Sequence, residues 1–337
     1  MWRTKVKNII LLVILIISST GAMAKDNLSS GAKSFANDFL ALVRVDSPSN
    51  IGKLISKGYS VDQQNRRGIT PLSTAILSNR YDMCSLLIKK GANVNALTKT
   101  GVPPLFLAII NNSIIMKELS MDSNKMKHDY MATLKKNLIL SYRVIQLLVK
   151  SGANVNQVIK NNHNLFKLQG LTPLSLAARE DNLMVAQLLI KNNVQINLSQ
   201  GAFFSPLIVA ANNGYKDMIK LLIHYGAHVN EKDNKIGFTP IIAVANSNIS
   251  DGVKYNIVKY FIEKGADVNS EAKSGMTALG AASNRNDIRT VKLLVKSGAN
   301  VNANLKTGEL SGLTPLDYAK LSKSWEVANY LVSHGAK

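Results

Sequence analysis

The sequence predicts an all-α fold, a solenoid of stacked helix-turn-helix units with short β-hairpin or turn tips. Three observations carry this prediction. The residues GANVN stand at 91–95, 152–156 and 298–302, and strings of the form GxTPL recur about a dozen residues after most copies. The third is spacing, since 33 residues separate Pro71 from Pro104 and Pro173 from Pro206. A fixed period of this length indicates one unit repeated, because a single unit cannot bury its apolar face alone.

Residues 1–24 are predicted to form a secretory signal peptide. Basic residues at positions 3, 5 and 7 precede an apolar run at 9–17, and small residues end the segment at Ala24. This order is typical of leaders that are removed on export. The apolar run is shorter than the roughly 20 residues that span a bilayer. We therefore expect cleavage after Ala24, no membrane span in the mature protein, and a periplasmic or secreted location.

The mature chain divides into a cap and an array. Residues 25–67 are predicted to be a divergent N-terminal capping repeat, with helices in SFANDFLALVR and SNIGKLISKGYSVD. Residues 68–337 are predicted to hold about seven repeats. Their expected bounds are 68–100, 101–169, 170–201, 202–236, 237–274, 275–311 and 312–337.

Each repeat carries its own start and stop signals. Threonine followed by proline is typical of a helix start, because the hydroxyl caps free backbone N–H groups and proline fits the first helical position. The glycine after LLxx can adopt the left-handed backbone that closes a helix, and Asn193 replaces it in one copy. The asparagine that ends the five-mer is expected to bond local backbone. The five-mer is therefore interpreted as structural.

These paired helices, the TPL string and the 33-residue period resemble the ankyrin-repeat family, from about Phe35 to the last residue. The chain departs from that family's pattern in one respect. The histidine of the TPLH motif is absent, and residues such as Ser73 and Ser175 stand in its place. This change removes a hydrogen-bonding ladder typical of the family and leaves the predicted fold intact.

One repeat contains an insertion at about 112–139. From Pro104 to Gly152 there are 48 residues, against 20 in ordinary copies. Met121, Met126 and Met131 have spacings compatible with helix, so an extra hairpin that packs on the stack or contacts a partner is one interpretation. A decayed repeat is the other, because the 69 residues from Pro104 to Pro173 are close to two periods.

The resemblance implies that partners bind the turn tips and the exposed side of the first helices. Phe203 and Phe204 stand where other copies have Gly-x, so they either anchor a partner or fill the vacated space. Carried over by position, the predicted protein-binding residues are Phe166, Arg179, Phe203, Phe204, Asn212, Asn213, Phe238, Asn284 and Arg285.

The charge balance is strongly basic, with 41 Lys+Arg against 21 Asp+Glu and a net charge of +20. This excess favours an acidic protein partner. Many lysines, such as Lys191 and Lys296, fall near the ends of second helices, where they complement the helix dipole in solvent. Basic residues interleaved with aromatics in one groove are not found, so no nucleic-acid partner is predicted. We expect a monomer.

Signals for catalysis are scarce. The sequence contains no GxSxG, HExxH or GxxxxGK string. His224 and His228 are separated by a helix end, and Cys84 is expected to be a buried small hydrophobe. No catalytic residue, cofactor or metal is therefore predicted, and an enzyme site hidden in the insertion is the third functional option.

The predicted function is that of a non-enzymatic scaffold for protein–protein interaction, exported to the periplasm. Likeness to exported bacterial ankyrin proteins favours an immunity or inhibitor protein that neutralises a cognate toxin or hydrolase. The alternative is a secreted, host-directed ankyrin effector that binds a eukaryotic target protein.

Overall fold

The computed structural model describes residues 39–121, 128–160, 168–198, 205–308 and 311–337. The predicted leader at 1–24 and the first part of the capping segment lie outside these residues. The chain forms two compact units. The first runs to residue 169 and includes 191–193, and the second contains the rest from residue 170 onward.

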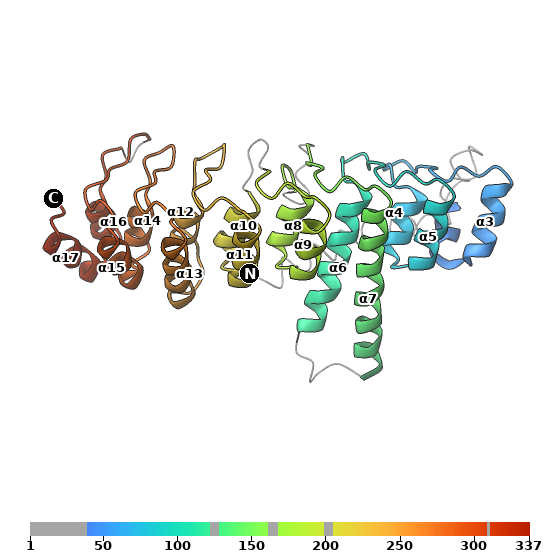
Figure 1. Cartoon of the computed structure of the whole chain (residues 1–337), viewed down its shortest axis with the longest axis horizontal. Helices are drawn as coiled ribbons and strands as arrows, with labels where there is room; N and C mark the ends of the chain where they lie inside the picture. The colour runs from blue at the N-terminus through green and yellow to red at the C-terminus, as the bar shows by residue number, and fades with distance from the viewer. Residues whose placement is uncertain (1–38, 122–127, 161–167, 199–204, 309–310) are drawn as a thin grey trace, which may run out of the picture. The chain divides into compact units, whose positions relative to one another are not determined.

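The first unit is built from helices in antiparallel pairs. Residues 39–45 are helical, and the later helices pack in two rows, α3 on α5 and α5 on α7, with α4 on α6 (Figure 1). The bounds are α3 Pro48–Ser56, α4 Pro71–Leu77, α5 Tyr81–Lys89, α6 Pro104–Ser120 and α7 His128–Lys150.

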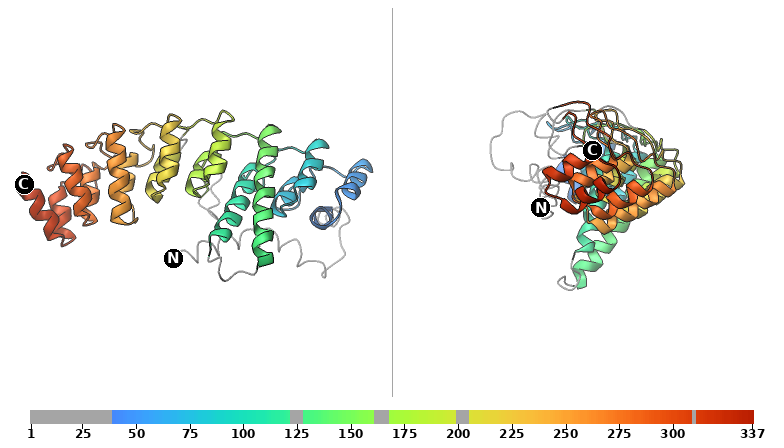
Figure 2. Two further views of the ribbon diagram at one scale, coloured as in Figure 1. Left: turned by 60° about the horizontal axis from the view of Figure 1, so that its bottom comes forward. Right: turned by 90° about the vertical axis from the view of Figure 1, so that its left-hand side faces the viewer.

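The second unit repeats the same pair five times. Its first helices α8, α10, α12, α14 and α16 pack in a continuous row, and each second helix packs beside its own first helix (Figure 2). The bounds are α8 Pro173–Arg179, α9 Leu183–Ile190, α10 Pro206–Asn213, α11 Lys216–His224, α12 Pro240–Ala245, α13 Asp251–Glu263, α14 Ala278–Asn284, α15 Ile288–Lys296, α16 Pro315–Leu321 and α17 Trp325–Ser333. No β-strand forms in the described residues, and the tips are turns.

The predicted helix starts are confirmed at most repeats. The hydroxyls of Thr70, Thr172, Thr277 and Thr314 accept hydrogen bonds from backbone N–H groups three residues on. At Thr314 this becomes a capping box, and the backbone hydrogen bond from Thr314 lowers the pKa of the Asp317 carboxyl. Where the family's histidine is missing, Ser73 still bonds the cap hydroxyl of Thr70 at 3.1 Å. Part of the expected loss is therefore compensated locally.

At five positions the asparagine that ends the five-mer bonds the next repeat, which corrects the expectation of local bonding. Asn230 donates from Nδ2 to the Gly265 carbonyl at 3.0 Å and accepts at Oδ1 from the Asp267 N–H at 2.8 Å. The local turn is closed by another residue, since the Asp267 carboxylate accepts from the Asn269 N–H at 2.9 Å. The same clamp recurs at Asn95, Asn197, Asn269 and Asn302. GANVN thus recurs because its last asparagine forms hydrogen bonds that join successive repeats.

The insertion lengthens two existing helices. Residues 112–120 continue α6 and residues 128–139 begin α7, so that α6 has 17 residues and α7 has 23. Ile115 and Leu134 are buried in this hairpin. At its base, Asn112 donates to the Ser141 hydroxyl at 2.8 Å, and Asn79 donates to the Asn137 carbonyl at 3.0 Å. The described part of the insertion is therefore a helical hairpin continuous with its repeat.

Cys84 lies in α5 and is fully buried, as predicted. Burial raises the pKa of its thiol to about 12. At pH 8 only about one thiol in ten thousand is then the reactive thiolate, so iodoacetamide is expected to leave the native protein unmodified. Mass spectrometry should show one adduct only after unfolding in guanidinium chloride. Complete alkylation of the native protein within minutes would contradict this burial.

Candidate protein-binding surface

The predicted binding residues that the structure describes lie at opposite ends of the first helices. Arg179, Asn212 and Asn213 lie at the C-terminal ends of α8 and α10. Asn284 and Arg285 occupy the corresponding end of α14. Phe238 instead precedes α12, at the tips, and is half-buried. Phe166, Phe203 and Phe204 lie outside the described residues.

Several residues of the C-terminal group already bond the chain itself. Arg285 donates to the Asn246 carbonyl at 2.7 Å and also to the Asn248 side chain. The carbonyl and the side-chain oxygen of Asn284 accept from the Ser322 hydroxyl at 3.0 and 3.1 Å. These bonds brace neighbouring repeats, so a partner at this end would meet side chains that are partly committed.

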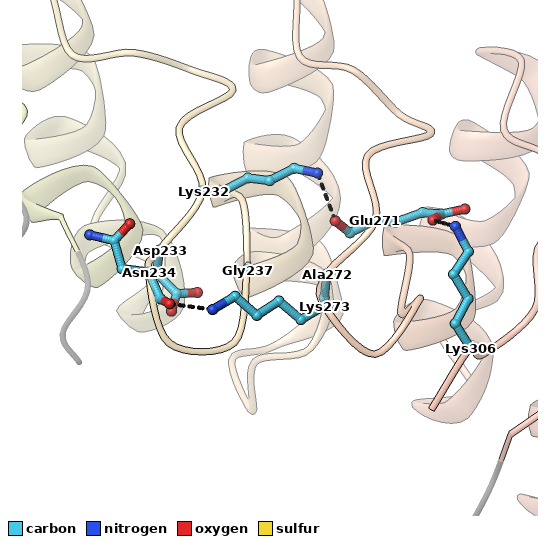
Figure 3. Close-up of a pocket in the computed structure, with 8 residues that line it drawn as sticks. All are labelled: Lys232, Asp233, Asn234, Gly237, Glu271, Ala272, Lys273 and Lys306. Carbon is cyan, nitrogen blue, oxygen red and sulfur yellow. Dashed lines mark hydrogen bonds and ion pairs between the residues drawn. The ribbon is translucent and has the colours of Figure 1, made fainter. Parts of the chain in front are cut away.

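Three tips of the second unit line an open hollow of about 480 Å³ (Figure 3). Backbone bonds hold the tips in register, with the Lys273 N–H donating to the Ile236 carbonyl at 2.9 Å and the Lys306 N–H to the Ser274 carbonyl at 2.8 Å. The lining residues are Lys232, Asp233, Asn234, Gly237, Glu271, Ala272, Lys273 and Lys306.

Lys232, Lys273 and Lys306 line this hollow with the acids Asp233 and Glu271, which leaves one positive charge in excess. The Lys232 ammonium donates to the Glu271 carbonyl at 2.9 Å and the Lys273 ammonium to the Asn234 carbonyl, so neither lysine is held there by a carboxylate. Lys306 pairs with the Glu271 carboxylate. The other acid, Asp233, is buried and accepts backbone N–H bonds within its own turn. A carboxylate from a partner would find ammonium groups that still have free hydrogen-bond donors.

Sequence reasoning assigned the lysines mainly to second helices and missed those at the tips. Lys235 and Lys273 stand two positions before the tip glycines Gly237 and Gly275, and both are exposed. We call Lys232, Lys235, Lys273 and Lys306 the tip lysines. The first unit has the same arrangement at Arg66 and Lys99. This recurrence of a basic residue before the tip glycine is the signal that would have found them.

The described residues offer little for other chemistry. They contain no group of three or more His, Cys, Asp or Glu side chains placed to hold a metal ion. Among the helices that the structure describes, none has both the length and the apolar character needed to cross a membrane.

Comparison with known proteins agrees with the fold. The family model for ankyrin repeats (three copies) matches residues 40–129, 138–233 and 241–337. An ankyrin repeat protein of fowlpox virus is 30% identical over 155 residues, which is 45% of this chain and 43% of that protein. A mouse B-cell lymphoma 3 protein homolog is 29% identical over 157 residues, 45% of this chain and 32% of its own.

A palmitoyltransferase of Lachancea kluyveri is also similar, at 26% identity over 235 residues, 66% of this chain and 30% of the enzyme. In each of these three pairs the match spans less than half of the relative's length. The helix pairs, the inter-repeat asparagine clamps and a family match over most of the sequence agree. The chain therefore belongs to the ankyrin-repeat family, whose repeats indicate a scaffold for protein–protein interaction.

Proposed function

We propose that this chain is a non-enzymatic scaffold that binds an acidic partner protein through the tip lysines of the second unit. The observation that carries the proposal is the unbalanced charge of the hollow. Lys232 and Lys273 are held there by backbone carbonyls, and only Lys306 has a carboxylate partner in it. Complementary charge would speed encounter with an acidic surface and fix its register on the tips.

We further propose that the protein acts in the periplasm, as an immunity or inhibitor protein against an acidic toxin or hydrolase. The basic, apolar and small-residue order of residues 1–24 supports export. The basic tips support an acidic target, and the step to immunity is an analogy with other exported ankyrin proteins. Capture of a prey from a eukaryotic cell lysate, and of none from periplasmic extract, would favour the host-directed effector instead.

The tip lysines are tested by charge reversal. A Lys235→Glu, Lys273→Glu variant should bind its partner at least about tenfold more weakly, because two attractive contacts become repulsive. The partner is first captured from periplasmic extract on the mature chain, then purified and titrated by isothermal calorimetry. The Phe203→Ala, Phe204→Ala variant is titrated beside it.

The matched control is Lys216→Glu, Lys296→Glu, which makes the same change in net charge on the exposed second helices α11 and α15. Equal losses in both charge-reversed variants would mean that only net charge matters and would overturn the tip site. Loss in the phenylalanine variant alone would move the site to positions 203 and 204.

A further inference from the structure

The hairpin of α6 and α7 projects beyond the other helices of the first unit (Figure 1). α6 has ten more residues than the 7-residue α4, which at 1.5 Å per residue adds about 15 Å of helix. The clamps and tip bonds that join successive repeats do not need this extra length. The surface of this projecting hairpin is therefore available for contact with a partner.

One face of α7 gathers exposed cations around an exposed apolar side chain. Lys135, Lys136, Ile139 and Arg143 are all exposed, and their spacing at 100° per residue places them within one third of the helix circumference. We call these four residues the α7 face. Ile139 is 62% exposed at its centre. Exposed isoleucine ringed by cations is the arrangement of an interface anchor with a charged rim.

The cations of the α7 face lack the acidic neighbours found on other second helices. In the second unit, Lys220 pairs with Asp217 at 3.9 Å, and Lys292 pairs with Glu326 at 3.2 Å. Within the described residues no carboxylate lies within ion-pair distance of Lys135 or Lys136. Two acids lie on the hairpin: Glu118 accepts from the Tyr130 hydroxyl, and Asp129 occupies the first turn of α7, on the side of Lys136 but seven residues before it.

Arg143 fixes the base of this face. Its guanidinium lies 4.1 Å from the ring centroid of Tyr81 on α5, so its position is set by a cation–π contact. The guanidinium can still donate to a partner, because its N–H groups point outward in its own plane and the ring covers a face. Arg143 is thus positioned before a partner binds, and Lys135 and Lys136 extend into solvent from the same helix.

We propose that the α7 face is a second docking surface, which binds an acidic amphipathic helix of a partner protein. Glutamates of that helix would neutralise Lys135, Lys136 and Arg143, and its apolar side would cover Ile139. A second copy of this chain does not fit, because each mature copy would carry a net charge of +17, the +20 of the full chain less the three basic residues of the leader. A membrane fits less well, because interfacial binding needs a broad apolar face, whereas a partner helix can bury one isoleucine and be held mainly by its charge pairs. The proposal does not depend on the tip lysines.

The test uses the full mature chain and a defined probe. The probe is a fluorescent helical peptide of about 20 residues with leucines on one face flanked by glutamates, and its glutamine version is the uncharged control. Anisotropy should show binding that weakens about tenfold in Lys135→Glu, Lys136→Glu and severalfold in Ile139→Ala. All changed side chains are exposed, and circular dichroism checks that the helices are retained.

Two further variants make the outcome decisive. Lys216→Glu, Lys296→Glu matches the change in net charge, and Lys235→Glu, Lys273→Glu removes the tip lysines. The proposal requires that the α7 variants lose more affinity than either of these. Equal losses, loss only in the tip variant, or no binding of the peptide would each overturn it. Co-sedimentation with phosphatidylglycerol vesicles without peptide binding would overturn it in favour of a lipid surface.

Discussion

Replacing Gly237 with alanine is expected to lower the free energy of unfolding of the second unit by about 3–5 kcal/mol. Gly237 has φ +75°, a conformation that L side chains rarely adopt. An added Cβ would lie 2.8 Å from the Lys273 backbone nitrogen, closer than carbon and nitrogen can approach. The tip of the next repeat would have to move, which would break the bond from the Lys273 N–H to the Ile236 carbonyl.

Gly265→Ala is the matched control, because it separates backbone strain from the collision. Gly265 has φ +83°, and a Cβ added there would meet no atom within 4 Å beyond its two neighbours in the chain. Only the strain of the left-handed conformation applies at this position, about 1 kcal/mol. Guanidinium chloride unfolding followed by far-UV circular dichroism measures both variants. Equal shifts of the two midpoints would show that the close approach of neighbouring tips does not limit the fold.

Gly237 also lines the hollow of the tip lysines. Displacing the neighbouring tip would separate Lys235 from Lys273, so we expect Gly237→Ala to weaken partner binding as well as stability. Gly265→Ala should leave binding unchanged. This result would connect the spacing of the tips to recognition, since no charge is altered in either variant.

Local signals in the sequence predicted the local structure well. Threonine followed by proline marked the starts of α4, α8 and α16, where the threonine hydroxyls cap the helix. Asn193 adopts φ 60°, as expected for a residue that replaces the closing glycine. Such features depend on a few neighbouring residues, so the sequence alone is sufficient to predict them.

Hydrogen bonds between adjacent repeats could not be predicted from these local signals. The clamp of Asn230 reaches Gly265, and the bonds of Arg285 reach Asn246 and Asn248, in each case in an adjacent repeat. Whether a polar side chain bonds its own turn or the next one depends on how the repeats stack. For this reason the sequence identified Arg285 as an exposed groove residue but did not show its bonds to the preceding repeat.

The structure of the insertion also could not be predicted from its local pattern. Helical spacing of its methionines indicated helix, but a hairpin and a decayed repeat have the same local pattern. The choice depends on what Ile115 and Leu134 pack against, and the structure buries them in the hairpin. The exposed α7 face follows from that packing, since burial of one side of α7 determines which residues face solvent.

Lys254→Met is expected to lower the free energy of unfolding by about 3–5 kcal/mol, because it leaves a buried carboxylate without its counter-charge. The Lys254 side chain is 3% exposed and that of Asp287 1%, with the ammonium 3.6 Å from the carboxylate. Asp251 lies 3.3 Å from the same ammonium but is mostly exposed. Asp287 also caps α15 by accepting from the Thr290 N–H at 3.1 Å. Loss of Lys254 therefore affects both α13 and α15.

A double-mutant cycle tests whether the pair or the methylene packing of Lys254 is responsible. Asparagine at position 287 can still accept from the Thr290 N–H, so Lys254→Met, Asp287→Asn should be more stable than Lys254→Met alone. Lys259→Met is the control on the same helix. Its partner Glu263 is 4.0 Å away and both side chains are 56% exposed, so its effect should stay within about 0.5 kcal/mol. Additive effects in the cycle would mean that the ion pair contributes nothing specific, and the loss would then be assigned to packing between α13 and α15.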